Sequence, residues 1–296
     1  MSKGAKRLYC IYLVLLLAYT AYTALDTFVI RRVETVLDTP QPAETPDASG
    51  AEIVVTADSY QDENIHISLS TQRLEDTTVY IADVTLSSAE YLKTALAQNA
   101  YGKNVTEKTS AIAARQNAIL AVNGDYYGSR ERGYVLRNGV LYRSTVAADQ
   151  EDLVILSDGS FAMIRENETS AASLLEQGAM QVLSFGPALV EDGSVTVSQT
   201  DEVGKAMASN PRTAIGIVAP LHYVFVVSDG RTNESAGLSL YELALLMQSL
   251  GAQMAYNLDG GGSSTLYFNG AVINNPTTGG GRIRERSVSD IVYIGY

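Results

Sequence analysis

The chain contains 296 residues, of which 46% are hydrophobic, so it can form one large folded domain or two small ones and is not a disordered protein. Its one cysteine, Cys10, lies in an apolar N-terminal segment, which excludes a disulfide or a thiolate zinc site from the rest of the chain. Residues 47–296 contain 16 of the 21 Lys and Arg residues and 29 of the 33 Asp and Glu residues, a net charge of −13. We therefore expect no nucleic-acid partner, and no anionic-lipid partner unless a local basic site overrides this field.

The first thirty residues predict a transmembrane anchor. Residues 8–25 carry no charge, Asp26 interrupts them, and residues 28–30 are apolar again. A single helix over residues 8–30 spans roughly 30 Å at about 1.5 Å per residue, which is enough to cross a bilayer. A cleavable signal peptide is the alternative, but it lacks a small-x-small cleavage site here.

The charges beside this anchor predict its orientation. The amino terminus and the three basic residues within residues 1–7 outweigh Arg31 and Arg32 on the other side. Under the positive-inside rule, residues 1–7 form a cytoplasmic tail, and the rest of the chain lies outside the cell. We therefore expect a single-pass protein of the cell membrane with an extracellular body.

The chain beyond the anchor divides into a stalk and one domain. Residues 38–50 hold three of the seven prolines and almost nothing apolar, which is typical of an extended linker, so we assign residues 31–52 to a stalk. Residues 53–296 form the domain. Four Asx-Gly pairs between β-rich runs predict hairpins in it, within "YVLRNGVLY", "LVILSDGSFAMI", "ALVEDGSVTV" and "LYFNGAVI".

Helices interrupt these strands at two or three places. An S-x-x-E capping box opens residues 87–100 and another begins the helix predicted over residues 238–251, while residues 106–116 are a weaker third candidate. No internal repeat is present. The predicted fold class is α+β: a single β-rich domain with a mixed or antiparallel sheet and two or three helices, preceded by an N-terminal transmembrane helix.

The histidines give no sign of a catalytic site. His66 and His222 lie near no cysteine and no promising acidic cluster, which argues against a Ser-His-Asp triad or a multi-histidine metal site and favours structural or surface roles for both. Any catalysis must therefore come from carboxylates, arginines, amides, tyrosines or backbone groups. We expect no cofactor and no metal site, although calcium remains open because acidic loops can bind it without EF-hand spacing.

Three apolar runs end in polar residues that such chemistry could use. The first ends at Asn123 and Asp125, the second at Asp229 and Arg231, and the third at Asn257 and Asp259. Loops at the ends of rigid strands are common places for active sites. The alternative for each is an ordinary Asx-Gly turn, but no matched second strand follows directly.

The segment of residues 210–231 predicts a hairpin centred on Pro220 and Leu221. Antiparallel pairing about that centre places Arg212 opposite Asp229, with Arg231 on the same face. The alternatives are a salt bridge beside a surface arginine, and an anion site in which the two guanidinium groups bind phosphate oxygens.

Three consecutive glycines lie in "NLDGGGSSTLY". They allow positive φ angles and let backbone N–H groups approach an anion or the oxygens of a sugar. The absence of lysine excludes a nucleotide P-loop, and the spacing does not match a G-x-S-x-G nucleophile elbow. Ser263 and Ser264 are therefore interpreted as hydrogen-bonding residues, and a merely flexible loop is the alternative.

Five ordered motifs carry a resemblance to a known family. They are "NGDYYG", "NPRTAIGI", "VVSDGR", "LSLYELALLMQSLGAQMAYNLDGGGSSTLYFNG" and "RSVSDIVYIG", and the resemblance covers about residues 80–296. In this order they resemble the phosphodiester glycosidase family, typified by the uncovering enzyme of lysosomal mannose 6-phosphate. The chain departs from that enzyme in lacking its cysteine-rich segments and in having its anchor at the amino end, which excludes the lysosomal substrate.

The resemblance implies a hydrolase that cleaves the C1–O bond of a sugar-1-phosphodiester, and in a bacterial setting it implies a cell-surface glycan or exopolysaccharide as substrate. An oxocarbenium-like transition state calls for a carboxylate near the ring and a positive clamp on the phosphate. We expect Asp259 to be the essential carboxylate, Asp125 or Asp229 to be the second, and Arg212 and Arg231 to hold the phosphate.

The other expected substrate-binding residues position the sugar or lie further out: Asn123, Asn257, Gly260, Gly261, Gly262, Ser263, Ser264, Arg286 and Asp290. Two other functions stay open. One is a non-catalytic glycan-binding module on the cell surface, and the other is a glycosidase that acts on glycosides without phosphate.

Overall fold

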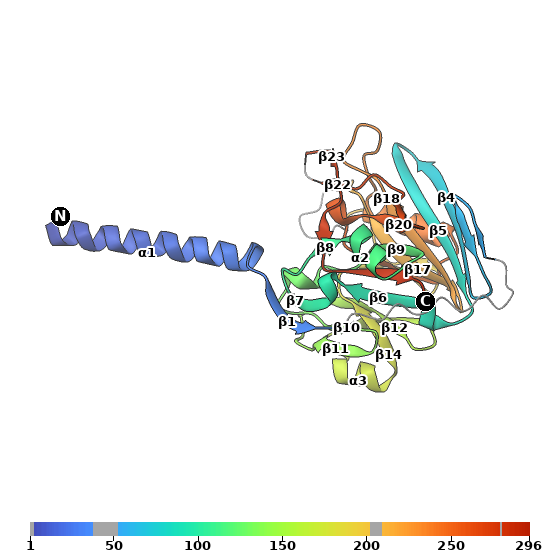
Figure 1. The fold of residues 1–296 in the computed structure, drawn as a ribbon, viewed down its shortest axis with the longest axis horizontal. Helices are drawn as coiled ribbons and strands as arrows, with labels where there is room; N and C mark the ends of the chain where they lie inside the picture. The colour runs from blue at the N-terminus through green and yellow to red at the C-terminus, as the bar shows by residue number, and fades with distance from the viewer. Residues whose placement is uncertain (1–2, 38–52, 202–208, 279) are drawn as a thin grey trace.

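The computed structural model describes residues 3–37, 53–201, 209–278 and 280–296, and it has a β-rich body with one projecting helix (Figure 1). This helix, α1 (Lys3–Phe28), has no buried residue, and its length and composition suffice to cross a membrane. Strand β1 (Arg32–Val36) follows it and pairs with β7 (Ala100–Lys103) of the body. The first part of the predicted stalk is therefore a strand of the body, and residues 38–52 lie outside the described residues.

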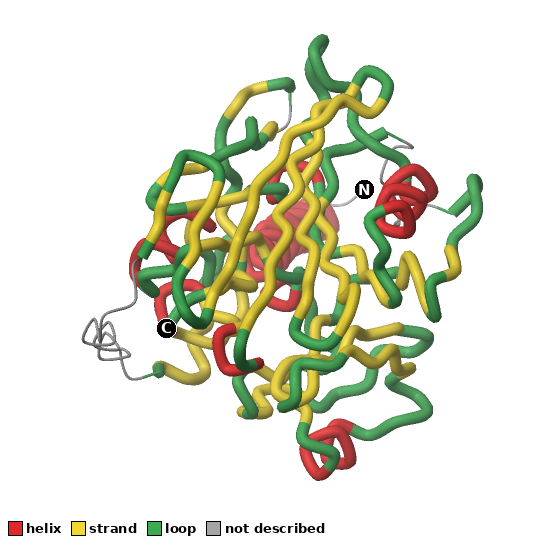
Figure 2. The backbone as a smooth tube through the Cα atoms, turned by 90° about the vertical axis from the view of Figure 1, so that its right-hand side faces the viewer, coloured by secondary structure: helices red, strands yellow, loops and turns green. Residues whose placement is uncertain are grey.

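A nine-stranded antiparallel sheet forms the largest layer of the body, and its long strands cross the view in Figure 2. Successive apolar side chains of its strands point to opposite faces, so both faces are apolar and are covered by other layers. In spatial order the strands are β16 (Ser194–Val195), β15 (Ala188–Glu191), β19 (Met254–Asn257), β17 (Thr213–Ala219), β18 (His222–Ser228), β5 (Thr77–Leu86), β4 (Ile65–Leu74), β3 (Ser59–Gln61) and β2 (Val54–Val55).

A five-stranded sheet packs on one face of this layer and helix α4 (Leu240–Ser249) covers the other. Phe225 and Tyr256 face the five-stranded sheet, where they meet Val122 and Val292, whereas the alternate residue Val226 faces α4. Helix α2 (Thr109–Arg115) covers the outer face of the five-stranded sheet. In spatial order its strands are β21 (Ala271–Val272), β20 (Leu266–Phe268), β9 (Leu120–Asn123), β25 (Asp290–Ile294) and β6 (Leu92–Leu96).

A second five-stranded sheet completes the body, with helix α3 (Ala171–Glu176) packed on it. Its strands are β11 (Val140–Arg143), β10 (Val135–Arg137), β14 (Ala179–Leu183), β12 (Glu151–Leu156) and β13 (Phe161–Arg165). Two short strand pairs lie at the periphery: β22 (Thr277–Thr278) with β23 (Arg282–Ile283), and β8 (Glu107–Lys108) with β24 (Ser287–Val288). Single 3₁₀ turns are η1 (Ala89–Tyr91), η2 (Ala97–Asn99), η3 (Tyr127–Ser129) and η4 (Gly261–Ser263).

The predicted fold class is confirmed, as a β-rich α+β domain behind an N-terminal apolar helix. All four predicted hairpins are present. The capping box at Ser239 and Glu242 begins α4, and α2 lies within residues 106–116. Helix α3 was not predicted from the sequence, because its six residues are too few to show a clear helical periodicity.

The predicted helix over residues 87–100 is wrong. Ser88 caps only the short turn η1, and the residues after it form strand β6, which pairs along its whole length with the C-terminal strand β25. Leucine, alanine and lysine favour a helix locally, but this preference is worth only a few tenths of a kcal/mol per residue. Pairing with a strand almost 200 residues away, and burial in the core, outweigh it.

A pair of acidic residues is buried in the sheet that carries α3. Asp152 is fully buried, and neither of its carboxylate oxygens has a hydrogen-bond partner among the described residues. Glu166 is nearby, and it accepts hydrogen bonds from the backbone N–H groups of Tyr134 and Ala147 at 2.7 and 2.6 Å. Burial, together with the charge of Glu166, raises the pKa of Asp152 to about 9. Asp152 is therefore protonated at neutral pH in the folded chain.

This raised pKa predicts how Asp152→Asn changes stability with pH. In the unfolded chain Asp152 ionises near pH 4, whereas in the folded chain it stays protonated up to about pH 9. The stability that this group contributes is therefore fully present below pH 4 and is lost progressively as the pH rises to about 9. The asparagine does not ionise, so we expect Asp152→Asn to raise the unfolding free energy relative to the parent chain, by an amount that grows from pH 4 to about pH 9. Urea unfolding of the full chain in detergent from pH 4 to 9 measures this. Glu168→Gln, at an exposed site in the same region, is the control and should be neutral at every pH.

Candidate functional site

The ends of the two packed sheets meet at one edge of the body. Asn123 ends β9 and Asn257 ends β19, where it is paired with Ala214 of β17. Thr213 of β17 donates a hydrogen bond to Asn123 Oδ1 at 2.9 Å, and Asn123 Nδ2 donates to the Asp259 carbonyl at 2.6 Å. Asn123 thus joins the two sheets and holds the backbone of the segment that follows β19. The structure thus brings Asn123 and Asp259 into direct contact, and Asn257 lies two residues before Asp259.

Asp259 lies in a partly buried cluster with a hydroxyl and a guanidinium group. Its Oδ2 accepts hydrogen bonds from Ser263 Oγ at 2.5 Å and from Arg286 Nη2 at 2.9 Å. Arg286 also donates from Nε to Ser263 Oγ at 2.9 Å, and its side chain is 45% exposed whereas that of Asp259 is 11% exposed. Burial raises the pKa of Asp259, and the charge of Arg286 opposes this shift. Both of these side-chain hydrogen bonds are accepted by Oδ2.

A second guanidinium group lies beside this cluster. Arg231 donates from Nη2 and Nε to Asn210 Oδ1 at 2.8 and 3.1 Å, and its backbone has a positive φ of 61°, which is uncommon outside glycine. Burial, and then the neighbouring charge of Arg286, lowers the pKa of Arg231, whereas Asp259 acts in the opposite direction. Two arginines and one carboxylate leave a net charge of +1 at this place, which suits a singly charged anion.

The glycine loop makes room for this arrangement. A Cβ atom on Gly261 would lie 2.8 Å from Nη2 of Arg231, and Gly261 has a positive φ of 62°. A Cβ atom on Gly260 would lie 2.8 Å from the carbonyl oxygen of Pro211, and Gly262 contacts Thr278 closely. The Gly261 N–H donates to the Pro211 carbonyl at 2.8 Å, so it is not directed at a ligand. The glycines thus permit close approach of protein groups, and the predicted approach of a ligand to this loop stays a prediction.

The predicted pairing of Arg212 with Asp229 is wrong by one residue. The β17–β18 hairpin contains a bulge between Ile217 and Ala219, and beyond it Thr213 pairs with Val227, so Arg212 lies opposite Ser228. A shift of one residue moves a side chain to the other face of the sheet. Arg212 is buried and its Nε donates to the Leu238 carbonyl at 2.8 Å.

Asp229 has a set of partners separate from the Asp259 cluster. Its carboxylate accepts hydrogen bonds from Tyr80 Oη at 3.1 Å, from the Asn275 backbone at 2.8 Å and side chain at 3.1 Å, and from Asn274 Nδ2 at 3.3 Å. Asn274 also donates to the Ser264 carbonyl at 3.0 Å. Asp229 therefore fastens the loop before β22 to the end of β18 and supports the glycine loop indirectly.

Asp125 and Asp290 lie together in a buried ion-pair network around Arg137. Nη2 of Arg137 contacts Asp125 and its Nε contacts Asp290, each at 2.7 Å, and all three side chains are buried. Burial raises the pKa of Asp290 to about 7, although Arg137 opposes this. A Cβ atom on Gly124 would lie 2.3 Å from Asp290 Oδ1, and the Gly124 carbonyl accepts from the Asp259 N–H at 3.3 Å. This network therefore lies directly beneath the backbone of Asp259.

Sequence analysis missed Arg137 because its motif, "LRNG", was interpreted only as a hairpin turn. The one available signal for a functional arginine was its position directly after two apolar residues and directly before an Asn-Gly turn. Asn210, Asn274 and Asn275 were also missed, since each is an ordinary turn residue by its local sequence. Among the described residues, no group of three or more His, Cys, Asp or Glu side chains is arranged to hold a metal ion.

Some buried polar atoms near the strand ends have no partner. Oδ1 of Asn257, Oγ of Ser264 and Oγ1 of Thr265 accept or donate no hydrogen bond in the described part of the chain. Such atoms are rare in folded proteins and are often satisfied by a ligand or by water. Asn257 Nδ2 donates to the Gly186 carbonyl at 2.7 Å, which fixes the direction of its amide.

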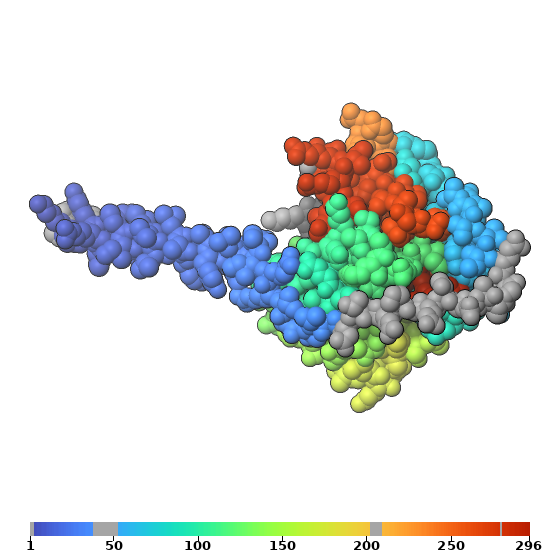
Figure 3. Space-filling model, viewed as in Figure 1, coloured from blue at the N-terminus to red at the C-terminus, as the bar shows by residue number. Residues whose placement is uncertain are grey.

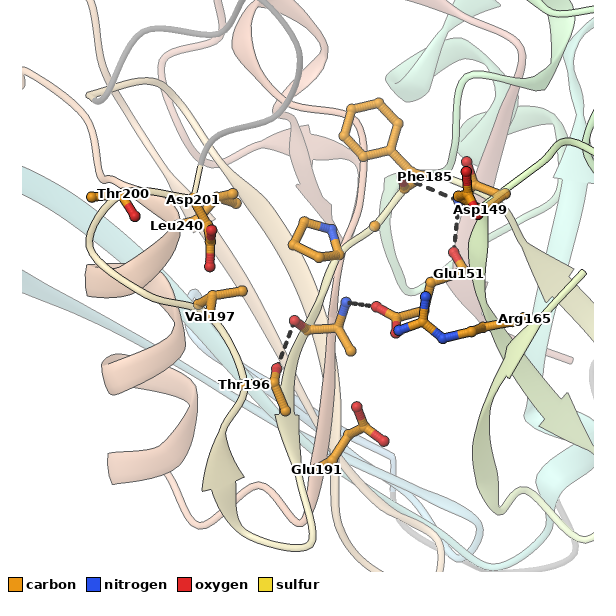
Figure 4. Close-up of a pocket in the computed structure, with 14 residues that line it drawn as sticks. Asp149, Glu151, Arg165, Phe185, Glu191, Thr196, Val197, Thr200, Asp201 and Leu240 are labelled. Carbon is orange, nitrogen blue, oxygen red and sulfur yellow. Dashed lines mark hydrogen bonds and ion pairs between the residues drawn. The ribbon is translucent and has the colours of Figure 1, made fainter.

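A cavity of about 750 Å³ lies apart from the Asp259 cluster (Figure 4). Its lining includes Gly186, whose carbonyl accepts from Asn257, but none of the side chains predicted for the site. Within it Glu151 accepts from the Ala188 N–H at 2.8 Å and lies 3.5 Å from Arg165. We therefore locate the candidate site at Asp259 and not in this cavity.

Comparison with known proteins identifies the family. A model of the phosphodiester glycosidase family matches residues 116–295, which is more than half of the chain. The SPbeta prophage-derived uncharacterized protein YomE of Bacillus subtilis is 31% identical over 201 residues, covering 66% of this chain and 31% of that protein. Mouse N-acetylglucosamine-1-phosphodiester alpha-N-acetylglucosaminidase is 26% identical over 173 residues, covering 53% of this chain and 33% of the mouse protein. The matches thus span about a third of the length of these relatives.

Solved structures share the fold. The catalytic domain of zebrafish N-acetylglucosamine-1-phosphodiester alpha-N-acetylglucosaminidase, auto-inhibited by its pro-peptide, superimposes with a TM-score of 0.62 at 19% identity, covering 90% of this chain and 89% of that domain. A hypothetical protein from Synechocystis gives a TM-score of 0.55 at 16% identity, covering 84% and 64%. The family predicted from the five sequence motifs is confirmed: the chain belongs to the phosphodiester glycosidase family, a family of hydrolases.

Proposed function

We propose that this protein hydrolyses a sugar-1-phosphodiester at the Asp259 cluster. The observation that carries the proposal is the charge of the site, where Arg231 and Arg286 flank the carboxylate of Asp259. These three groups together have a net charge of +1, which matches the single negative charge of a phosphodiester. The family and the named activity of the mouse relative support this reaction. Water adds to C1 of the sugar, the C1–O bond breaks, and the phosphate leaves as a monoester of its other alcohol.

The proposed roles follow from the contacts of each group. Asp259 Oδ1 faces the anomeric carbon and stabilises the positive charge that develops there, while Ser263 and Arg286 hold Oδ2 and fix the carboxylate. Arg231 and the outer nitrogen atoms of Arg286 bind the departing phosphate. Because a phosphodiester oxygen is already a good leaving group, one carboxylate suffices, and no histidine is needed to protonate it.

The remaining predicted residues take supporting roles in this proposal. Asn257 and Ser264 present unpartnered polar atoms to the sugar, and Asn123 holds the Asp259 backbone. Arg212 adds positive charge behind the loop. Asp229 organises the glycine loop through its hydrogen bonds, and the other two predicted carboxylates, Asp125 and Asp290, support it through Arg137.

We also propose a location for the reaction. Helix α1 anchors the chain in the cell membrane, and the positive charges of residues 1–7 keep the amino terminus in the cytoplasm, so the body is extracellular. Residues 53–296 then form the catalytic domain, and β1 attaches it to the anchor. A phosphorylated glycan of the cell surface, or an exopolysaccharide, is the substrate that this location supports.

The role of Asp259 predicts the effect of Asp259→Asn. Because the amide cannot stabilise the developing positive charge, we expect kcat for release of free sugar from a panel of sugar-1-phosphodiesters, including sugar nucleotides, to fall about 100-fold or more. Circular dichroism checks that the variant is folded. Normal turnover by the variant would contradict the role of Asp259. Saturable glycan binding without any product from the parent chain would instead favour a binding module.

The phosphate clamp makes a separate prediction. Arg231→Gln and Arg286→Gln each remove a charged hydrogen-bond donor, so we expect kcat/KM for the phosphodiester to fall about 10- to 100-fold. Arg165→Gln changes an exposed arginine of β13, in the sheet that carries α3, and is the matched control, expected to leave kcat/KM unchanged. The same sugar linked to an alcohol without phosphate should not be hydrolysed, and its hydrolysis at a comparable rate would point to an ordinary glycosidase.

A further inference from the structure

The end of helix α1 is fastened to the body. Only residues 29–31 separate α1 from β1, whose Arg32 and Val33 pair with Lys103 and Gly102 of β7. Arg31 Nη1 donates to Gln98 Oε1 at 2.8 Å, and Asn104 Nδ2 donates to the Ile30 carbonyl at 2.9 Å. Because this connection is short and hydrogen-bonded to the body, it restricts rotation of the body relative to α1. One side of the body therefore faces the surface that α1 enters.

That side can be identified from the arrangement of the elements. Figure 1 shows β1, β7, β8, β22 and β23 along the side of the body from which α1 projects, and β4 on the opposite side. Figure 3 shows orange-red residues, close to the C-terminal end of the colour bar, on the same side of the body. If α1 crosses the membrane, these strands are the part of the body nearest to the lipid.

The β22–β23 hairpin carries the chemistry of a membrane contact. Arg282, Ile283 and Arg284 are all exposed at its end, and Ile283 is 65% exposed. Basic residues at a bilayer surface are attracted to anionic lipid, and an exposed apolar side chain between them enters the headgroup region. In a body with a net charge of −13 this hairpin is a local basic site.

The candidate site lies beside this hairpin. A Cβ atom on Gly262 would lie 3.3 Å from the Cα atom of Thr278 in β22. Arg286, the most exposed group of the Asp259 cluster, follows Arg284 by two residues and directly precedes β24, which pairs with β8. The Asp259 cluster and the basic hairpin therefore lie on the same side of the body, the side from which α1 projects.

We propose that the substrate of this site is anchored in the membrane, as a sugar-1-phosphate esterified to a lipid alcohol. The inference rests on the proposed function and on α1 as a membrane span. The hairpin holds the site at the level of the lipid headgroups, where the phosphodiester of such a molecule lies. Arg231 and Arg286 bind the phosphate at this level, and the released sugar leaves toward the solvent while the lipid phosphate remains in the bilayer.

The test uses the full chain in vesicles of phosphatidylethanolamine and phosphatidylglycerol. Two substrates carry the same sugar-1-phosphate, one esterified to hexadecanol and the other to methanol. We expect the hexadecyl ester, at equal total concentration, to be hydrolysed at least about 10-fold faster. Equal rates for the two esters would overturn the inference and leave the proposed function standing, whereas hydrolysis of neither ester would overturn both.

Variants separate the hairpin from the catalytic groups. We expect the double change Arg282→Gln and Arg284→Gln, and separately Ile283→Ser, to slow hydrolysis of the hexadecyl ester about 10-fold while leaving the methyl ester unaffected. Arg165→Gln, at an exposed site of β13 in the sheet that carries α3, should change neither rate. An unchanged hexadecyl rate in both hairpin variants, or an equal loss for both esters, would overturn the role of the hairpin at the membrane.

Discussion

The hydrogen bonds of Asn123 are the constraint on which the site depends. Asn123 accepts from Thr213 of the nine-stranded sheet, belongs to the five-stranded sheet, and donates to the Asp259 carbonyl. All of these atoms are buried, where a lost hydrogen bond is costly. The two sheets are therefore held in a fixed register relative to each other, meaning one fixed relative position, at the edge where β9 and β19 end. The position of Asp259 follows from that register, since its backbone also bonds to Gly124.

Charge is arranged in two levels around Asp259. The outer level, with Arg231 and Arg286, is partly exposed and has an excess of positive charge. The inner level, with Arg137 between two aspartates, is fully buried and lies beneath the Gly124 backbone. Burial of charged groups is costly, and Arg137 offsets part of this cost by pairing with both aspartates. Through Gly124, the inner level supports the backbone of Asp259, which precedes the glycine-rich segment.

Much of the site could be predicted because strand ends and glycines are local signals. The runs ending at Asn123 and Asn257, and the three glycines after Asp259, were recognised by composition alone. The register of Arg212 could not be predicted, because a single bulge in β17 shifts it and bulges leave little local signal. Arg137 was missed because its partners, Asp125 and Asp290, lie 12 and 153 residues away in sequence.

The sequence by itself determined the family, the apolar N-terminal helix, the four hairpins, α4 with its capping box, and the residue types of the site. Each of these depends on neighbouring residues, whose periodicity, turn chemistry and motif order are visible along the chain. The tertiary structure decided that residues 92–96 form a strand and that Asp229 and Asp259 have separate partners. It also decided that β1 joins the body. These outcomes depend on contacts between distant segments, whose burial and hydrogen bonding outweigh local preferences.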